Sequence, residues 1–257
     1  MSAADARPQR LPEVVLVLGM HRSGTSAVTG LLEEQGMWTG EPPAATVHSP
    51  RGTRENRRIR RLHERILRQN GATWWRPPAG PVALRPRHRA RRDAILSEAD
   101  RPTAVVKDPR ILLLLELWRD LAVRRIGVIR NPVSVAHSLL ARGAPATDLG
   151  FAGCVELWKH YSGELLTELE RDPFPVVDFD RGALPEQVAA ALGLIELPAA
   201  RPLTFFEPGA VRHAAADWRG RTGDREAIDL WDRLERFAQR HGPGRATPPG
   251  GKRKRER

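Results

Sequence analysis

Short apolar runs alternate with longer segments of helical periodicity along this chain of 257 residues. Each apolar run is rich in Val, Ile or Leu and is bounded by charged, Gly or Pro residues, which is typical of strands buried in a parallel sheet. The longer segments repeat apolar residues every three or four positions, which predicts helices. Strands that alternate with helices predict an α/β fold, a three-layer sandwich with a mainly parallel sheet covered on both faces. The predicted strands are 14–18, 103–106, 125–129 and 175–179, and the predicted helices are 27–35, 53–70, 111–120, 132–142, 149–170, 184–192 and 226–240.

A single domain over residues 13–245 accounts for all of these elements, and a chain of this length can bury a sizeable core. Residues 1–12 and the basic tail 246–257 are expected to be disordered. The segment 72–92 is rich in Pro and Arg and is predicted to be a flexible insertion or lid, and residues 194–223 are expected to be irregular.

The formal net charge of +11 suits an anionic ligand without specifying one. The basic tail is either a solvated end or a segment attracted to nucleic acid or membrane, and we favour the solvated end. The tryptophans are scattered, unlike those of a stacking surface, so no nucleic-acid partner is expected. Neither a membrane span nor a signal peptide is expected, which makes the cytoplasm the expected location. Cys154 is the single cysteine, which excludes an intrachain disulfide and a Cys-rich metal site.

The segment GMHRSGTS at residues 19–26 follows the first predicted strand and opens the first predicted helix. Strand, glycine-bounded loop and helix in this order are typical of a phosphate-binding loop, because the glycines let the backbone wrap an anion and the helix N-terminus attracts it. The spacing is that of G-x-x-x-x-G-K-[ST], but Thr25 stands in place of the lysine and the nearest cation is Arg22. The loop therefore predicts a phosphate binder that is not an ordinary ATPase.

Two further predicted strands end in polar residues, Lys107-Asp108 and Arg130-Asn131. Because ligands of parallel α/β sheets bind outside the carboxyl ends of the strands, we expect these residues to lie near the loop 19–26. A fold of the P-loop type, with its site at this edge, follows from that arrangement.

Three ordered blocks of the chain resemble the sulfotransferase family. They are GMHRSGTS (19–26), KDPR (107–110) and RNPVSVAHSLLAR (130–142), and residues 55–67 and 230–238 also look like bacterial members. The likeness spans roughly residues 13–240 and is greatest to the bacterial and tyrosylprotein-type branch, whose loop carries arginine. It implies a sulfotransferase domain that moves a sulfuryl group from 3′-phosphoadenosine 5′-phosphosulfate to a hydroxyl or amine acceptor, without a metal.

The resemblance also implies roles for particular residues. Arg22 would act in binding and in catalysis, and Lys107 would stabilise the charge that develops on the transferred group. Arg130 and Ser138 would bind the 3′-phosphate, and Arg142 could join them from one helical turn beyond Ser138. As alternatives, Ser138 and Arg142 are ordinary helix residues, and Asp108 pairs with Lys107 or Arg110. The residues expected to hold the 5′-phosphate are Arg22, Ser23, Gly24, Thr25 and Ser26.

A general base is needed because the acceptor hydroxyl loses its proton during attack. The resemblance points to Glu55, although Arg54 replaces the aromatic residue that usually precedes this glutamate, and Phe179 replaces a nucleotide-contacting tyrosine. Glu55 is alternatively a first-turn carboxylate that favours the helix dipole. The other candidate bases are Glu41, His48 and His63.

Two other functions stay open at this point. One is a magnesium-dependent kinase of the P-loop class, against which the missing loop lysine argues, and the other is an anion-binding or docking protein without catalysis. A small molecule, glycan, lipid or peptide would all suit as the acceptor of a sulfotransferase.

Overall fold

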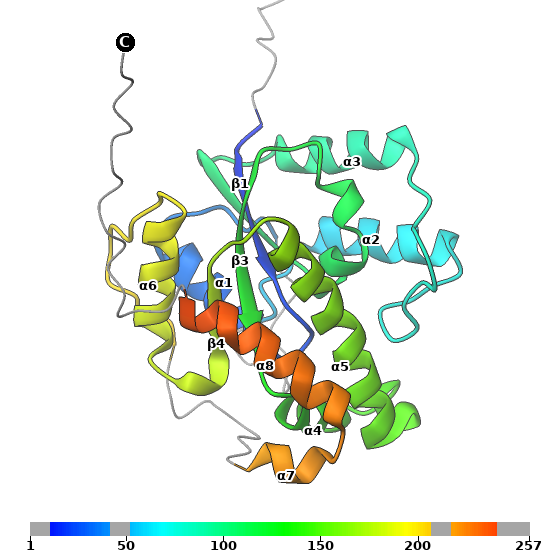
Figure 1. The fold of residues 1–257 in the computed structure, drawn as a ribbon. Helices are drawn as coiled ribbons and strands as arrows, with labels where there is room; N and C mark the ends of the chain where they lie inside the picture. Colours follow the sequence, from blue (N-terminus) through cyan, green and yellow to red (C-terminus); the bar gives the residue numbers. More distant parts are fainter. Residues whose placement is uncertain (1–10, 42–51, 207–216, 241–257) are drawn as a thin grey trace, which may run out of the picture.

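The computed structural model describes residues 11–41, 52–206 and 217–240. Four parallel strands form one sheet in the order β2-β1-β3-β4, with β1 and β3 at its centre (Figure 1). Val15 of β1 pairs with Val105 of β2 and with Arg124 of β3. The strands are β1 (Glu13–Leu18), β2 (Thr103–Lys107), β3 (Val123–Ile129) and β4 (Val176–Asp178).

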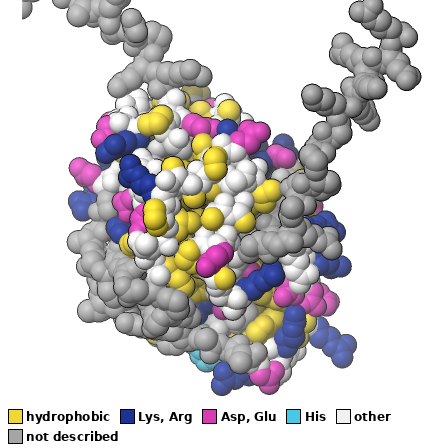
Figure 2. Space-filling view, turned by 90° about the vertical axis from the view of Figure 1, so that its left-hand side faces the viewer, with side chains coloured by type: hydrophobic (Ala, Val, Ile, Leu, Met, Phe, Trp, Pro, Cys, Tyr) yellow, Lys and Arg dark blue, Asp and Glu magenta, His cyan; other side chains and the backbone are white. Residues whose placement is uncertain are grey.

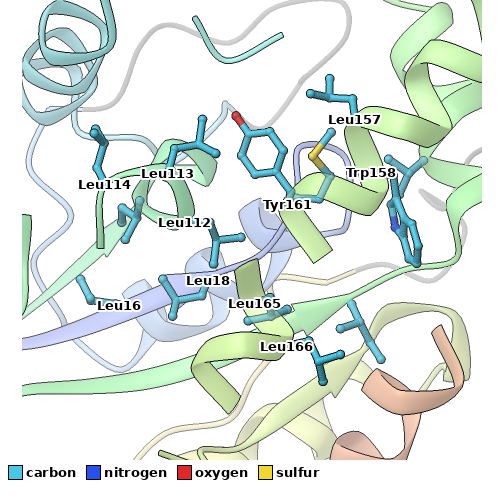
Figure 3. Close-up of a cluster of buried hydrophobic side chains, with 14 of the residues drawn as sticks. Leu16, Leu18, Leu112, Leu113, Leu114, Leu157, Trp158, Tyr161, Leu165 and Leu166 are labelled. Carbon is cyan, nitrogen blue, oxygen red and sulfur yellow. The ribbon is translucent and has the colours of Figure 1, made fainter. Parts of the chain in front are cut away.

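Helices cover both faces of this sheet, so the predicted three-layer α/β sandwich is confirmed. Val15 and Val17 pack with α1 and α6, whereas Leu16 and Leu18 face the opposite layer. Figure 3 shows Leu16 and Leu18 among leucines that follow β2 and side chains of α5. The helices are α1 (Thr25–Glu34), α2 (Arg57–Gln69), α3 (Pro86–Leu96), α4 (Pro132–Leu140), α5 (Ala146–Arg171), α6 (Leu184–Leu194), α7 (Trp218–Thr222) and α8 (Arg225–Arg240).

The α6 side of the molecule carries hydrophobic side chains that lie among polar and charged ones (Figure 2). Leu194, at the end of α6, is 43% exposed. No helix in the described part of the chain is long and apolar enough to cross a membrane.

The predicted helix 111–120 is wrong. The segment forms two 3-10 turns instead, η1 (Pro109–Leu113) and η2 (Leu115–Leu117). Leu112, Leu113 and Leu114 are all buried, so consecutive side chains enter the core and leave no polar face for a surface α-helix.

The segment 72–92 is also more regular than expected, because α3 begins within it at Pro86. The buried positions of α3 include His88 and Arg92, and Arg92 donates two hydrogen bonds to the Asp120 carboxylate. A buried face built partly from charged residues breaks the apolar periodicity on which the sequence prediction relies. The region 194–223, expected to be irregular, likewise contains the short helix α7.

Candidate functional site

The carboxyl ends of β1, β2 and β3 meet at one edge of the sheet, and the predicted site residues follow these ends. The loop 19–24 joins β1 to α1, Lys107 ends β2, and Arg130 follows β3. Hydrogen bonds described below connect all three segments. The structure therefore brings the loop 19–24, Lys107 and Arg130 to one edge of the sheet.

The loop between β1 and α1 has the backbone geometry of an anion cradle. Arg22 and Gly24 both adopt positive φ angles, 69° and 91°, and the Ser23 N–H donates to the Met20 carbonyl at 3.2 Å. Such turns point successive N–H groups toward one concave surface. Gly24 precedes α1 without a side-chain cap, which leaves the helix N-terminus open to a ligand.

Phe179 explains why position 24 is glycine. A Cβ atom on Gly24 would lie 2.1 Å from Cδ2 of the Phe179 ring. That ring also lies under the guanidinium of Arg130, with 5.1 Å between the Arg130 Cζ atom and the ring centroid. The phenylalanine that replaces the expected tyrosine thus packs between the loop and Arg130.

The hydroxyl groups of the loop differ in what they bind. The Ser23 side chain is buried, and its Oγ atom has no hydrogen-bond partner within the described segments. A buried hydroxyl without a partner costs free energy, which an anionic oxygen would remove by accepting its hydrogen bond. Ser26 Oγ instead donates to the Thr53 carbonyl at 2.9 Å. Thr25 is buried, and its backbone carbonyl accepts a hydrogen bond from Thr29 Oγ1 at 2.8 Å.

Arg22 links the loop to the third block of the sequence. Its Nε atom donates to Ser138 Oγ of α4 at 2.9 Å, and the Arg22 carbonyl accepts a bond from Arg130 Nη1 at 3.1 Å. Arg130 is buried, and its Nε atom lies 3.4 Å from Oδ1 of Asp180. Burial lowers the pKa of Arg130 despite the Asp180 carboxylate, so a further anion beside it would favour the charged form.

Two residues that the sequence analysis did not assign to the site hold Arg130 and its neighbour in place. Trp158 of α5 is buried and donates from Nε1 to the Arg130 carbonyl at 2.9 Å. Asp180 accepts two bonds from Asn131, from the backbone N–H and from Nδ2, both at 2.7 Å. Asp180 follows the end of β4, so its position after a strand was the available signal.

Arg142 does not occupy the predicted position. Helix α4 ends at Leu140, so Arg142 lies beyond the helix rather than one turn along its face from Ser138, and it is exposed. Its charge still contributes to lowering the pKa of His21 in the loop. A contact between Arg142 and the nucleotide stays a prediction.

Lys107 and Glu55 form a buried ion pair beside the loop. Lys107 Nζ lies 2.9 Å from Glu55 Oε1 and also donates to the Thr53 carbonyl at 2.8 Å. The same Thr53 carbonyl accepts the hydrogen bond from Ser26 of the loop. Glu55 precedes α2, whose N-cap is Asn56, so it is not the first-turn carboxylate that the alternative interpretation assumed.

Asp108 is committed to a separate buried network. Its carboxylate accepts bonds from Arg110 Nη1 at 2.8 Å and from the Arg110 N–H at 3.0 Å, and its Oδ2 atom lies 2.9 Å from His63 Nδ1. Burial alone would raise the pKa of Asp108, but Arg110 and His63 hold it well below its usual range. His63 is fully buried and supports Asp108, which does not favour it as the base. Of the other alternative bases, Glu41 is exposed and His48 lies outside the described residues.

The side chain of the loop residue His21 packs against two aromatic side chains, those of Trp74 and Tyr161. Its ring centroid lies 4.5 Å from that of Trp74 and 5.8 Å from that of Tyr161. Burial, followed by the charge of Arg110, lowers the pKa of His21 well below its usual value, so the ring is neutral at pH 7.

Comparisons with known proteins identify no family for this chain. No family model matches the sequence, and no curated protein matches it. Among solved structures, the chain is similar to the sulfotransferase domain from the Synechococcus PCC 7002 olefin synthase, with 14% identity and a TM-score of 0.47. That match covers 91% of this chain and 98% of the other. The function is therefore argued from the site itself.

Proposed function

We propose that this protein is a sulfotransferase that uses 3′-phosphoadenosine 5′-phosphosulfate as the donor and a hydroxyl or amine group as the acceptor. The observation that carries the proposal is the 2.9 Å hydrogen bond from Arg22 Nε to Ser138 Oγ. It joins the loop expected at the 5′ end of the donor to the helix expected at its 3′-phosphate. A nucleotide with anionic groups at both ends suits two adjacent cationic segments.

The residues present fit such a donor. The buried hydroxyl of Ser23 has no partner in the described part of the chain, and the N-terminus of α1 has no side-chain cap, so both offer donors to an anion. Arg130 is desolvated and would gain from a further anion. The donor would supply the sulfuryl group, with its 5′ side at Arg22, Ser23, Gly24, Thr25 and Ser26 and its 3′ side at Arg130 and Ser138.

Lys107 and Glu55 are the residues proposed to assist the transfer. The Lys107 ammonium is buried at the end of β2, where a fixed positive charge stabilises negative charge that develops nearby. The Glu55 carboxylate is proposed to take the proton from the acceptor hydroxyl. The pair at 2.9 Å keeps these two groups adjacent, so proton removal and charge stabilisation would occur at neighbouring points.

No group of three or more His, Cys, Asp or Glu side chains that could hold a metal ion occurs in residues 11–41, 52–206 and 217–240. The proposal assigns the electrostatic role to arginine, lysine and backbone N–H groups instead. A magnesium-dependent kinase, against which the missing loop lysine argues, is tested beside the sulfotransferase.

Thermal unfolding in the presence of nucleotides tests the proposal, because a ligand that binds the folded state raises the Tm. We expect 3′-phosphoadenosine 5′-phosphate to raise the Tm without Mg²⁺, and ATP or ADP to raise it less. A shift that requires ATP together with Mg²⁺ would favour the kinase. No shift with any nucleotide would contradict the donor site.

A further inference from the structure

A small pocket lies beside the proposed donor loop, on the side of α2. Its volume is about 250 Å³, and its apolar walls come mainly from Leu67, Trp74 and Trp75. The two indole rings stand almost at right angles, with an interplanar angle of 78° and 5.5 Å between their centroids. Both tryptophans line the pocket, so a flat occupant would contact aromatic side chains there.

The pocket is connected to the donor loop through Trp74, and its wall includes Arg110 from the segment that follows Lys107. The Trp74 ring packs on His21 of the loop at a centroid distance of 4.5 Å. Arg110, another wall residue, lies three positions after Lys107 and is bonded to Asp108. The Tyr161 hydroxyl donates to the Trp74 carbonyl at 2.9 Å, which fixes the backbone of this wall. An occupant of the pocket would therefore lie near the donor loop and the segment that follows β2, on which the proposed site is built.

Positive charge lines one approach to the pocket. Arg61, Arg65 and Arg68 are exposed on α2 at positions i, i+4 and i+7, so they share one face of the helix. Arg68 lines the pocket itself, and so does Glu64, whose carboxylate is neutralised by Arg110 at 3.2 Å. Within the described part of the chain, none of these three arginines forms an ion pair, whereas Arg110 is already paired with Asp108 and Glu64. The cation available to an occupant is thus Arg68.

We propose that this pocket binds the ring of an aromatic acceptor that also carries an anionic group, which Arg68 recognises. The identification of the occupant as an acceptor rests on the proposed function, whereas the binding of an aromatic anion does not depend on it. The pocket volume of about 250 Å³ lies below the usual range for drug-sized ligands, which fits one or two rings. Shape and apolar walls select the ring, and the charge on Arg68 selects the anion.

Titration calorimetry without nucleotide tests the pocket, using three probes that share a phenol ring. These are 4-hydroxyphenylacetate, neutral phenol and cationic tyramine. We expect 4-hydroxyphenylacetate to bind at least about tenfold more tightly than tyramine, with phenol between them. The carboxylate of the first probe pairs with Arg68, phenol has no charge to pair, and the ammonium of tyramine is repelled. Equal affinities for the three probes would overturn the role of Arg68.

Charge reversal at an exposed position provides the decisive variant. Arg68→Glu should reverse the preference between 4-hydroxyphenylacetate and tyramine, whereas Arg91→Glu should leave it unchanged, because Arg91 is exposed on α3 and does not line the pocket. Trp75→Leu should weaken all three probes about equally. A preference that survives Arg68→Glu, or affinities unaffected by Trp75→Leu, would overturn the proposal.

Binding measurements with the same protein distinguish a failure of the pocket proposal from a failure of the proposed function. We expect 3′-phosphoadenosine 5′-phosphate and 4-hydroxyphenylacetate to bind together without competition, because the pocket lies outside the loop 19–26. Nucleotide binding without binding of any phenol probe would overturn the pocket proposal alone. Phenol binding without nucleotide binding would support the pocket as an aromatic-anion site and contradict the sulfotransferase. Mutual exclusion would place the probe in the nucleotide site and overturn the pocket.

Discussion

The ammonium of Lys107 and the carboxylate of Glu55 lie 2.9 Å apart, joined across 52 positions of the sequence. Lys107 is 3% exposed at its side chain and Glu55 is 10% exposed, so water screens this pair little. The Thr53 carbonyl, bonded to both Lys107 and Ser26, attaches the pair to the loop after β1. The proposed charge stabiliser and base are therefore one structural unit with the proposed phosphate cradle.

Breaking this pair should destabilise the protein through the charge that is left behind. Lys107→Met should lower the free energy of unfolding by about 3 kcal/mol, because it leaves the Glu55 carboxylate buried without its partner. The double variant Lys107→Met with Glu55→Gln should recover part of that loss. Urea denaturation of the single and double variants measures the coupling, and strictly additive losses would contradict a coupled pair.

Glu55→Gln should lower kcat about 100-fold or more while changing the affinity for 3′-phosphoadenosine 5′-phosphate little, because only the proton acceptor is removed. Steady-state kinetics and nucleotide titration of the same variant check the two halves of this expectation. Glu41→Gln serves as the comparison, since Glu41 is an exposed residue and one of the alternative bases. A larger loss in the Glu41 variant would move the base assignment away from Glu55.

Arg130→Ala should weaken the binding of the donor far more than the binding of an acceptor. We expect at least about a tenfold loss of affinity for 3′-phosphoadenosine 5′-phosphate, because charge-assisted hydrogen bonds to phosphate are among the stronger polar contacts. Arg181→Ala, at an exposed position in η3 (Phe179–Arg181), is the matched control and should bind normally. An unchanged nucleotide affinity in Arg130→Ala would refute the assignment of the 3′ side.

Gly24→Ala should damage both stability and nucleotide binding. A Cβ atom there would clash with the Phe179 ring, and the φ angle of 91° disfavours any L residue. Gly163→Ala in α5 is the control, because nothing lies within 4 Å of its Cβ position and alanine favours a helix by about 0.5–1 kcal/mol. Thermal unfolding should show a lower Tm for the first variant and an equal or higher Tm for the second. A Gly24→Ala variant with normal Tm and nucleotide affinity would contradict the described loop geometry.

Asp178 should make the protein less stable as the pH rises through the weakly acidic range. Burial raises the pKa of Asp178 to about 6, above the value expected in an unfolded chain. The folded state then holds a proton that the unfolded state has lost, so stability falls between about pH 4 and pH 6 and stays lower above that window. Asp178→Asn should raise the Tm at pH 7.5 relative to the parent protein and change it little at pH 4.5. An equal effect at both pH values would contradict the raised pKa.

The hydrophobic periodicity and the glycine positions of the sequence were sufficient to predict those parts of the fold that contiguous residues determine. The strand at 14–18 and the loop at 19–26 are contiguous, so periodicity and glycine placement reveal them without tertiary information. The gathering of Lys107 and Arg130 beside that loop followed from one general property of parallel sheets, the common direction of their strands.

What the sequence did not reveal depends on contacts between distant segments. Helix α3 buries Arg92, whose guanidinium pairs with Asp120 in the turn before β3. No apolar stripe therefore indicates the helix. Asp180 and the Thr53 carbonyl act through bonds to Asn131, Ser26 and Lys107, which only the folded chain brings near. The pocket at Trp74 and Trp75 likewise needs α2 beside it, so a prediction from residues 72–92 alone could only describe a loop.

The central claim is that one site recognises phosphate groups at both ends of an adenine nucleotide. Titration calorimetry with 3′-phosphoadenosine 5′-phosphate and with adenosine 5′-phosphate, both without Mg²⁺, tests it most directly. We predict that the doubly phosphorylated nucleotide binds at least about tenfold more tightly, and that Arg130→Ala removes this difference by losing the charge-assisted contacts to the second phosphate. Equal affinities for the two nucleotides in the parent protein would contradict the account.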